Sequence, residues 1–533
     1  MKVALLFTPF ASPTYVPLGL ACLKGSLARE GEHPVCAFDL SNAYYRRLTD
    51  SGFVSGLRDL CGACWRNRLD CGGALKREDF ETRAASAYSA LEGLRADEET
   101  FGDSMRYNGL RSGADTFLSG LMRCLDCVLT SALETPSAAK DEALARALFA
   151  EGLGLLQRQK PDLVGFSVFS QHQLNYALCL AKALKRTMDV QIILGGAALP
   201  HLDARALLKL FPWVDFVALG EGEGALAGLL RGAARRDFSQ APGLLYRDVT
   251  GIVVNPEAPV PPESLPAPDF SDFDCGLYFS PKPVLSTCLG ARPIERVGAE
   301  LETLAAEGVR HVWLSDEGLS ARLLEGLADQ NSRRKLGLCW GAMARPTEDF
   351  TEGLLRKARE AGCAAMLWGV ESFQPRLLEL MEKGTTLKDI EGVLEASRRA
   401  GLFSEVTLIQ GFPTQTPEEA AAEEGYIRAH AELIGRIGTR RFRLEEGTRT
   451  AAEPERFGLK GLKRKVLLRT PEGELLSRQL SYEGEGREGA PDLNSLLARA
   501  QMDGAHPGRF ADSSLFYGLE HTLLHAQAWR RGP

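Results

Sequence analysis

Asp162-Leu163-Val164-Gly165-Phe166-Ser167 is the stretch that decides the fold of the first half of the chain. It is short and apolar, and the helical pattern from Asn175 to Arg186 follows it. A buried strand followed by an amphipathic helix is the repeating unit of a parallel sheet with helices on both faces. The unit recurs on either side, so we predict an α/β, Rossmann-like domain with further strands at residues 2–8, 34–40, 190–196 and 215–220.

A helical insertion separates the second and third predicted strands, at about residues 43–158. Its many Ala, Leu, Arg and Glu residues, with apolar residues spaced three to four apart, predict helices. We expect the insertion to lie over the ligand-binding end of the sheet or beside it. Together with the insertion, the first domain covers residues 1–245.

A proline-rich segment at residues 256–274 marks a domain boundary, because proline removes a backbone donor and ends helices and central strands. We assign the linker to residues 246–280. The alternation then resumes, which predicts a partial (β/α)6 barrel of the TIM type over residues 281–455 and leaves 456–533 as a C-terminal extension. The six predicted strands lie at residues 284–288, 309–315, 336–343, 364–369, 404–410 and 441–444.

Composition bounds the possible functions. At 533 residues the chain is too long for a single core, and a net charge of -7 without a basic stripe argues against nucleic acid as a partner. The apolar run Val3 to Phe7 is too short for a signal or membrane segment and continues into prolines, so we expect a cytoplasmic protein without membrane attachment. The 12 cysteines are scattered among apolar neighbours and indicate no disulfide framework.

Ligands of open parallel sheets bind beyond the carboxyl ends of the strands, where glycine lets a ligand approach the backbone closely. Each glycine alone could equally serve only to turn the chain. The residues that we expect to bind a cofactor at this edge of the first domain are Ser167, Phe169, Ser170, Gly195, Gly196, Ala197, Gly220, Glu221, Gly222 and Glu223.

Polar residues also follow the predicted barrel strands, where barrels place their binding residues. Carboxylates at these positions can accept from an ammonium group, and Arg345 can bind a carboxylate. Phe412 offers an apolar shelf for an aromatic ring, whereas the carboxylates could also simply cap the next helix. The expected binding residues are Asp316, Glu317, Arg345, Glu371, Ser372, Gly411, Phe412 and Pro413.

Several of these segments resemble cobalamin-binding radical S-adenosylmethionine proteins over about residues 1–450. The resemblance rests on Gly-Phe-Ser-Val-Phe-Ser at 165–170, Leu-Gly-Gly-Ala at 194–197, Leu-Gly-Glu-Gly-Glu at 219–223, Gly-Val-Glu-Ser at 369–372 and Gly-Phe-Pro-Thr-Gln-Thr-Pro-Glu at 411–418. The segment Arg441 to Thr448 further resembles the group that matures ribosomally made peptides.

The resemblance implies cobalamin at the first edge, S-adenosylmethionine at the second and a 4Fe-4S cluster beside it. It also implies methyl transfer, or a related modification, of a peptide or small natural product, with an electron donor as partner. No Asp-x-His-x-x-Gly pattern occurs, so a histidine ligand to cobalt is not indicated, although His172 stands in the corresponding loop region.

The chain departs from this family at the exit of the first barrel strand. Radical enzymes of this family bind their cluster through C-x3-C-x2-C, which this sequence lacks, and Ala291-Arg292-Pro293 follows Cys288-Leu289-Gly290 where the cysteine-rich loop is expected. Three alternatives stay open: an enzyme, a cobalamin or S-adenosylmethionine binding protein without radical chemistry, and a sequence from which the loop has been deleted. Cys61, Cys64, Cys124 and Cys127 form two CxxC pairs, but buried helical cysteine is the commoner role, and we expect no metal site.

Overall fold

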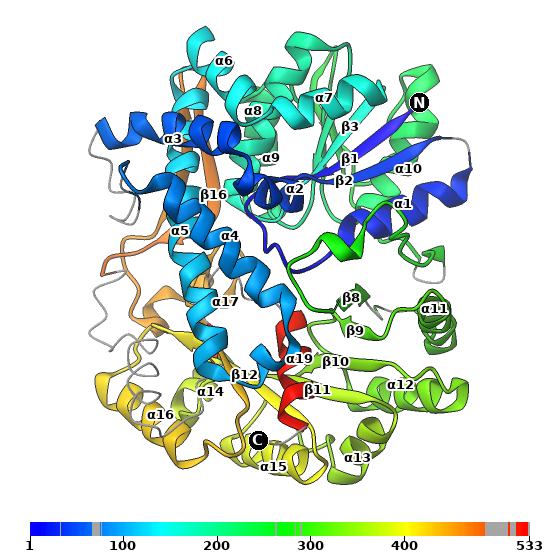
Figure 1. Ribbon diagram of the computed structural model, residues 1–533, viewed down its shortest axis with the longest axis vertical. Helices are drawn as coiled ribbons and strands as arrows, with labels where there is room; N and C mark the ends of the chain where they lie inside the picture. The colour runs from blue at the N-terminus through cyan, green and yellow to red at the C-terminus, as the bar shows by residue number, and fades with distance from the viewer. Residues whose placement is uncertain are drawn as a thin grey trace.

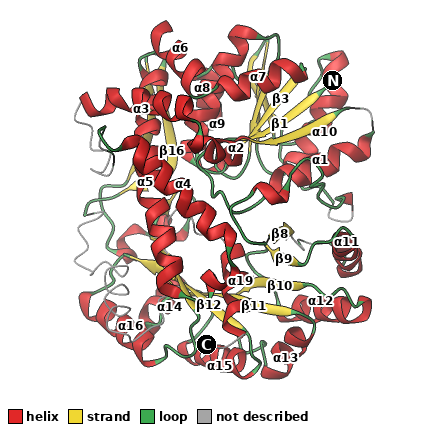
Figure 2. Ribbon diagram, viewed as in Figure 1, coloured by secondary structure: helices red, strands yellow, loops and turns green. Residues whose placement is uncertain are grey.

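The structure is a computed structural model that describes residues 1–31, 33–66, 75, 77–261, 264–282, 284–287, 290, 292–484, 510–511 and 519–530. Among these residues, two seven-stranded sheets and one three-stranded sheet organise the chain. The first sheet lies in the upper half of Figure 1 and the second in the lower half, and long helices run between them along one side. Figure 2 shows helices covering the outside of both sheets.

The first sheet has the predicted Rossmann-like architecture. Its five parallel strands stand in the order β2-β1-β3-β4-β5, and two antiparallel strands, β6 and β7, extend the sheet. Our linker assignment began at residue 246 and is wrong at its start. Leu244 and Leu245 are buried beside β5, and the strand that they begin pairs with residues 251–254, so the sheet continues past residue 246. The strands are β1 (Val3–Phe7), β2 (Val35–Asp39), β3 (Leu163–Ser167), β4 (Gln191–Gly195), β5 (Phe216–Ala218), β6 (Leu244–Asp248) and β7 (Gly251–Val254).

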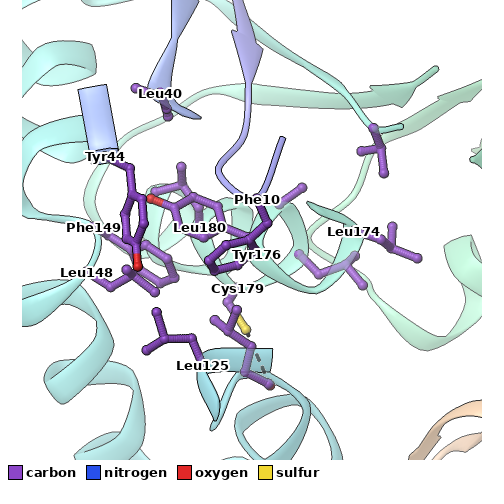
Figure 3. Packing of buried hydrophobic residues seen from close by; sticks show 14 of the residues in the cluster. Phe10, Leu40, Tyr44, Leu125, Leu148, Phe149, Leu174, Tyr176, Cys179 and Leu180 are labelled. Carbon is purple, nitrogen blue, oxygen red and sulfur yellow. Dashed lines mark hydrogen bonds between the residues drawn. The ribbon is translucent and has the colours of Figure 1, made fainter. Parts of the chain in front are cut away.

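Helices α1 (Leu18–Glu30), α8 (Gln171–Thr187), α9 (Ala204–Leu210) and α10 (Gly222–Gly232) cover this sheet. Aromatic side chains pack between α8 and the elements around it, as Figure 3 shows. The ring of Tyr176 lies edge-on to Phe149 and Phe10, with centroids 5.0 and 6.1 Å away. Such contacts bury large apolar surfaces and fix the loop after β1, which contains Phe10, against α8.

The insertion is helical, as predicted, and it bridges the two halves of the molecule. Helix α5 contacts α8 of the first domain, and η2 contacts the C-terminal helix α19 (Leu519–Arg530) in the second (Figure 1). The elements are α2 (Leu40–Arg46), η1 (Arg47–Thr49), α3 (Ser51–Arg66), α4 (Phe80–Ala96), η2 (Glu98–Phe101), α5 (Ser104–Glu134), α6 (Ala138–Ala147) and α7 (Ala150–Gln159).

Helix α5 is long and apolar enough, by length and composition, to cross a membrane. Half of its most apolar window is buried, and the helix packs against α3, α4 and α8. A core helix passes the same test of length and composition, so this property alone assigns no membrane role to α5.

The second sheet is the predicted partial barrel. All its described pairs are parallel, in the order β17-β13-β12-β11-β10-β9-β8. The strands are β8 (Val284–Thr287), β9 (His311–Leu314), β10 (Cys339–Ala344), β11 (Cys363–Glu371), β12 (Phe403–Gln410), β13 (Arg436–Arg441) and the two-residue β17 (Phe510–Ala511). The outer helices are α11 (Ile294–Ala306), α12 (Ala321–Arg334), α13 (Glu352–Glu360), α14 (Pro375–Met381), α15 (Leu387–Arg399) and α16 (Pro417–Ala429).

The sixth strand was predicted at residues 441–444, but it lies at residues 436–441. The strand is β13, and its inward side chain Arg436 is buried in an ion pair with Glu405 of β12, with Nη1 and Oε2 3.2 Å apart. A charged residue at a core position breaks the apolar pattern from which strands are predicted, so this strand could not be predicted from the sequence.

The C-terminal extension contributes to both halves. The antiparallel pair β15 (Lys463–Thr470) and β16 (Gly473–Ser481) joins β14 (Leu444–Glu445), and β16 also pairs with the first domain through a bridge between Ser477 and Leu202. Helix α19 packs on the inner face of the barrel, beside strands β9 to β12.

Candidate functional site

The carboxyl edges of the two large sheets approach each other. His201, six residues beyond β4, places Nδ1 2.8 Å from Oε2 of Glu445, four residues beyond β13. Ser477 of β16 donates to the backbone carbonyl of His201 at 3.3 Å, so the three-stranded sheet joins the two edges. The loops that follow β4 and β13 therefore meet between the two large sheets.

Phe169 and the Gly196-Ala197 turn form the exposed part of the first edge. The side chain of Phe169 is 66% exposed, which is unusual for a large apolar ring, and Gly196 and Ala197 are exposed beside it. Gly196 has a φ of 107°, and a Cβ there would lie 2.6 Å from the carbonyl oxygen of Val168. Glycine is thus required for the turn to pack against the loop after β3, and an exposed apolar edge of this kind fits a flat ring system.

The loop after β3 is held by Gln173, which sequence reasoning missed. This buried side chain accepts from the backbone N–H of Phe169 at 2.8 Å and donates to the carbonyl of Thr8 at 2.7 Å. Ser170 caps α8, and Ser167 is half-buried at the end of β3. A glutamine in the first turn of a helix that follows a ligand loop was the available signal.

His172 points to the insertion. Its Nδ1 lies 3.0 Å from Oδ2 of Asp126 on α5, and the other oxygen of Asp126 accepts from Asn175 at 2.8 Å. This contact orients the ring of His172 towards α5.

Gly220 to Glu223 lie against the linker. Glu221 accepts from the backbone N–H of Val260 at 2.6 Å, and a Cβ on Gly220 would meet the carboxylate of Glu257 at 2.6 Å. Gly222 packs closely on Leu23, and burial raises the pKa of the Glu223 carboxyl. These contacts give the segment a structural role in docking the linker.

Helix α19 fills the amino-terminal half of the barrel interior. Leu523 and Ala526 pack with inward residues of four strands, among them Trp313, Leu367 and Phe403. Side chains alternate along a strand, so the inward positions nearer the carboxyl edge lie above this layer. These positions are Ser286, Ser315, Met343, Arg345, Glu371, Thr407 and Arg440.

Arg345 and Glu371 are brought together through Lys383, a residue that the sequence did not single out. Lys383 donates from Nζ to Oε1 of Glu371 at 3.1 Å, and Arg345 donates to the carbonyl of Lys383 at 3.2 Å. Glu371 has a φ of 69°, an uncommon conformation for a non-glycine residue that turns the chain at the end of β11. The barrel edge thus presents groups of both signs, as a zwitterionic ligand requires.

Ser372 is buried and belongs to the support of the edge. Its hydroxyl donates to Oε1 of Glu423 on α16 at 2.7 Å, and the same oxygen accepts from the N–H of Phe373 at 2.9 Å. Gln415 donates to the second oxygen of Glu423 at 3.3 Å. Glu423 therefore connects the segment 369–372 to the segment 411–418, and burial raises the pKa of its carboxyl.

Phe412 is not available as a shelf for an aromatic ligand. Its ring is 4% exposed and packs against Phe442 and Phe457, with centroids 5.2 and 6.1 Å away. Pro413 is also buried, whereas Gly411 takes a φ of 66° to turn the chain. The expectation for Phe412 is corrected, because the C-terminal extension covers it.

A buried polar network lies beside the end of β8. Arg292 donates from Nη1 to Oε2 of Glu300 at 2.6 Å, both side chains being 4% exposed, and the hydroxyl of Thr287 donates to the other oxygen of Glu300. Asp316 accepts from the N–H of Gly290 at 2.7 Å, while Glu317 is exposed.

These residues do not fit a 4Fe-4S cluster, since they offer no thiolate, and Cys288 lies outside the described residues. Among the described residues no group of three or more His, Cys, Asp or Glu side chains is placed to hold a metal ion. Cys124 contacts the carbonyl of Cys61, and the side chain of Cys64 lies outside the description.

The comparisons with known proteins agree with this architecture. A model of the B12 binding domain matches residues 126–230. The chain is 25% identical over 305 residues to an uncharacterized methyltransferase of Pyrococcus horikoshii, covering 51% of this chain and 65% of that protein. It is 25% identical over 303 residues to the anaerobic magnesium-protoporphyrin IX monomethyl ester cyclase of Rubrivivax gelatinosus, covering 51% and 54%. Each match spans less than two thirds of the relative.

Two solved structures share the fold. The radical S-adenosylmethionine methyltransferase TsrM from Kitasatospora setae, with tryptophan substrate and a S-adenosylmethionine analog bound, is 16% identical with a TM-score of 0.59 over 99% of this chain and 96% of that chain. The cobalamin-dependent radical enzyme OxsB, with aqua-cobalamin bound, is 14% identical with a TM-score of 0.53 over 81% and 52%. The resemblance to cobalamin-binding radical S-adenosylmethionine proteins is confirmed for the fold and for the B12 binding domain.

Proposed function

We propose that the chain binds cobalamin between its two sheets and acts in methyl transfer, or a related modification, of a peptide or small natural product. The observation that carries the proposal is the exposed Phe169 beside the Gly196-Ala197 turn, at the carboxyl edge of a B12 binding domain. Bound cobalamin would supply a cobalt centre able to carry a methyl group.

The chain's own residues would orient the ligands. Phe169 offers an apolar face. Gln173 fixes the loop that contains Phe169 to the end of β1 through its hydrogen bonds to Phe169 and Thr8. At the barrel edge, the exposed Arg345 could bind a carboxylate, and Glu371, oriented by Lys383, could accept from an ammonium group. A small zwitterion, or the end of a peptide, has this combination of charges, and tryptophan occupies the related enzyme as its substrate.

The test of the first part is retention of hydroxocobalamin through gel filtration, read from its absorption spectrum. We expect about one corrin per chain, and Phe169→Ala should raise the dissociation constant about tenfold or more because an aromatic side chain buried by a ligand contributes about 2 kcal/mol. Val249→Ala removes an exposed apolar side chain at the turn between β6 and β7 and should have no effect. A wild-type chain that loses all corrin would overturn the proposal.

A cobalamin or S-adenosylmethionine binding protein without radical chemistry is the second candidate. It is favoured by the β8 exit, where Thr287, Arg292 and Glu300 satisfy one another and no cysteine triplet occurs in the sequence. After reconstitution with iron and sulfide, the chain incubated with dithionite and S-adenosylmethionine should release no 5'-deoxyadenosine above a control without protein. Product above that control would eliminate this candidate.

A further inference from the structure

Helix α19 contacts both halves of the molecule through its buried side chains. On one face, His521 lies with Nδ1 2.8 Å from the hydroxyl of Tyr107 on α5, and His525 lies with Nδ1 2.8 Å from the carbonyl of Phe101. Each histidine ring lies in a T-shaped arrangement with Phe101 and Tyr107, and the Tyr107 and His525 centroids are 4.5 Å apart. This face of α19 is therefore fixed to the insertion of the first domain (Figure 1).

The other face of α19 is fixed to the barrel by polar and apolar contacts. Arg436 of β13 donates to the hydroxyl of Thr522 at 2.7 Å, and that hydroxyl also contacts the carboxylate of Glu405. Gln527 Nε2 lies 2.7 Å from Nε2 of His311 on β9.

Leu523 supplies the apolar contact with the barrel. It is fully buried, and a Cβ on Gly341 of β10 would lie 2.4 Å from the ring of Trp313 and 2.8 Å from Leu523, so glycine leaves the space that both side chains occupy. His521, Thr522 and Gln527 each place one polar atom within hydrogen-bond distance of a group on another element, which is typical of a docked helix.

We propose that α19 is a positioning helix that fixes the first domain against the barrel, and so sets the distance between Phe169 and the barrel edge. This inference rests on the proposed function, because it assumes that the ligand between the sheets is held from both sides. The β14–β16 sheet ties the two carboxyl edges elsewhere, at His201 and Glu445. The two halves also share an apolar cluster that includes Leu5 of β1 and Leu285 of β8, so loss of α19 would loosen the docking of the halves without separating them. A ligand held from both sides would then bind more weakly although no residue of α19 touches it.

The test uses the full chain with Leu523→Asp, which places a carboxylate among Trp313, Leu367 and Phe403 and expels the helix. Leu277→Asp is the matched control, since Leu277 is 39% exposed on the linker. Alkylation of Cys339, which packs against the α19 cluster on the inner face of β10, reports whether the helix has left. Peptide mapping separates this thiol from the others.

We expect Leu523→Asp to speed alkylation of Cys339 and to raise the dissociation constant of hydroxocobalamin at least about tenfold, with the control unchanged. If alkylation of Cys339 becomes faster in Leu523→Asp while the affinity for cobalamin is unchanged, the positioning role is overturned. The double variant Tyr107→Phe, Thr522→Val removes only the polar ties and should give a smaller loss in the same direction.

Failure of the inference and of the proposed function can be told apart. If the wild-type chain retains no cobalamin, the proposed function fails, and α19 is then judged by small-angle scattering. Under the inference, Leu523→Asp increases the radius of gyration relative to both the wild type and Leu277→Asp, at unchanged far-ultraviolet circular dichroism. An unchanged radius of gyration together with faster alkylation of Cys339 would overturn the inference.

Discussion

Replacing Glu300 by Gln tests whether the buried polar network beside the end of β8 is a stable part of the fold. Glu300 and Arg292 are both 4% exposed, and their Oε2 and Nη1 atoms lie 2.6 Å apart. The change keeps the shape of the side chain and one acceptor oxygen, but it leaves a buried guanidinium without the negative charge that compensates it. Breaking a buried pair in this way costs about 3–5 kcal/mol. We expect about 3 kcal/mol, the lower end, because the amide oxygen still accepts one hydrogen bond.

Urea unfolding measures this cost, followed by the fluorescence of tryptophan. Trp313, Trp340 and Trp368, three of the six tryptophans of the chain, are buried in the barrel, so unfolding of the domain that contains Glu300 changes a large part of the signal. Glu302→Gln on the same helix is the matched control, because the Glu302 side chain is 54% exposed and pairs with Arg334 at the surface. An exposed pair contributes about 0.2–1 kcal/mol. A loss for Glu300→Gln no larger than that of the control would refute the reasoning, since the network would then hold nothing together.

Two further predictions concern Glu423 and the histidines around α19. Glu423→Gln should speed amide hydrogen exchange in the segments 369–372 and 411–418, because it weakens the contacts that connect them. Glu424→Gln, which removes a pair with Arg428, is the control and should leave exchange in these segments unchanged. Equal exchange in both variants would argue against the connection. Burial lowers the pKa of His311 to about 4 and that of His521 to about 3, so the unfolded chain binds protons first as the pH falls below about 6.5. Stability should therefore decrease from pH 6.5 towards pH 4, by up to about 3 kcal/mol for His311, and His311→Gln should flatten the slope of urea midpoint against pH; a slope unchanged by this variant would contradict the assignment.

The site residues divide by what kind of information specified them. Gly196 was identifiable from its motif, and the structure supplies the reason, a close approach to the backbone of Val168. Lys383 and Glu423 were not identifiable, because nothing in their local sequence indicates which loop each side chain reaches. Phe412 was assigned to the site and is buried beneath Phe457, a residue 45 positions away that the motif could not take into account.

The sequence by itself determined both α/β domains, the helical insertion and the lack of a cluster motif, because strand and helix periodicity and cysteine spacing are local properties. Only the tertiary structure decided that β13 is a strand, since Arg436 occupies a core position only when Glu405 and Thr522 are beside it. It also decided that α19, which begins 78 residues beyond the end of β13, lies inside the barrel. The physical reason is that a buried charge or polar helix face is stable only with its partner, and the partner is chosen by folding rather than by neighbouring sequence.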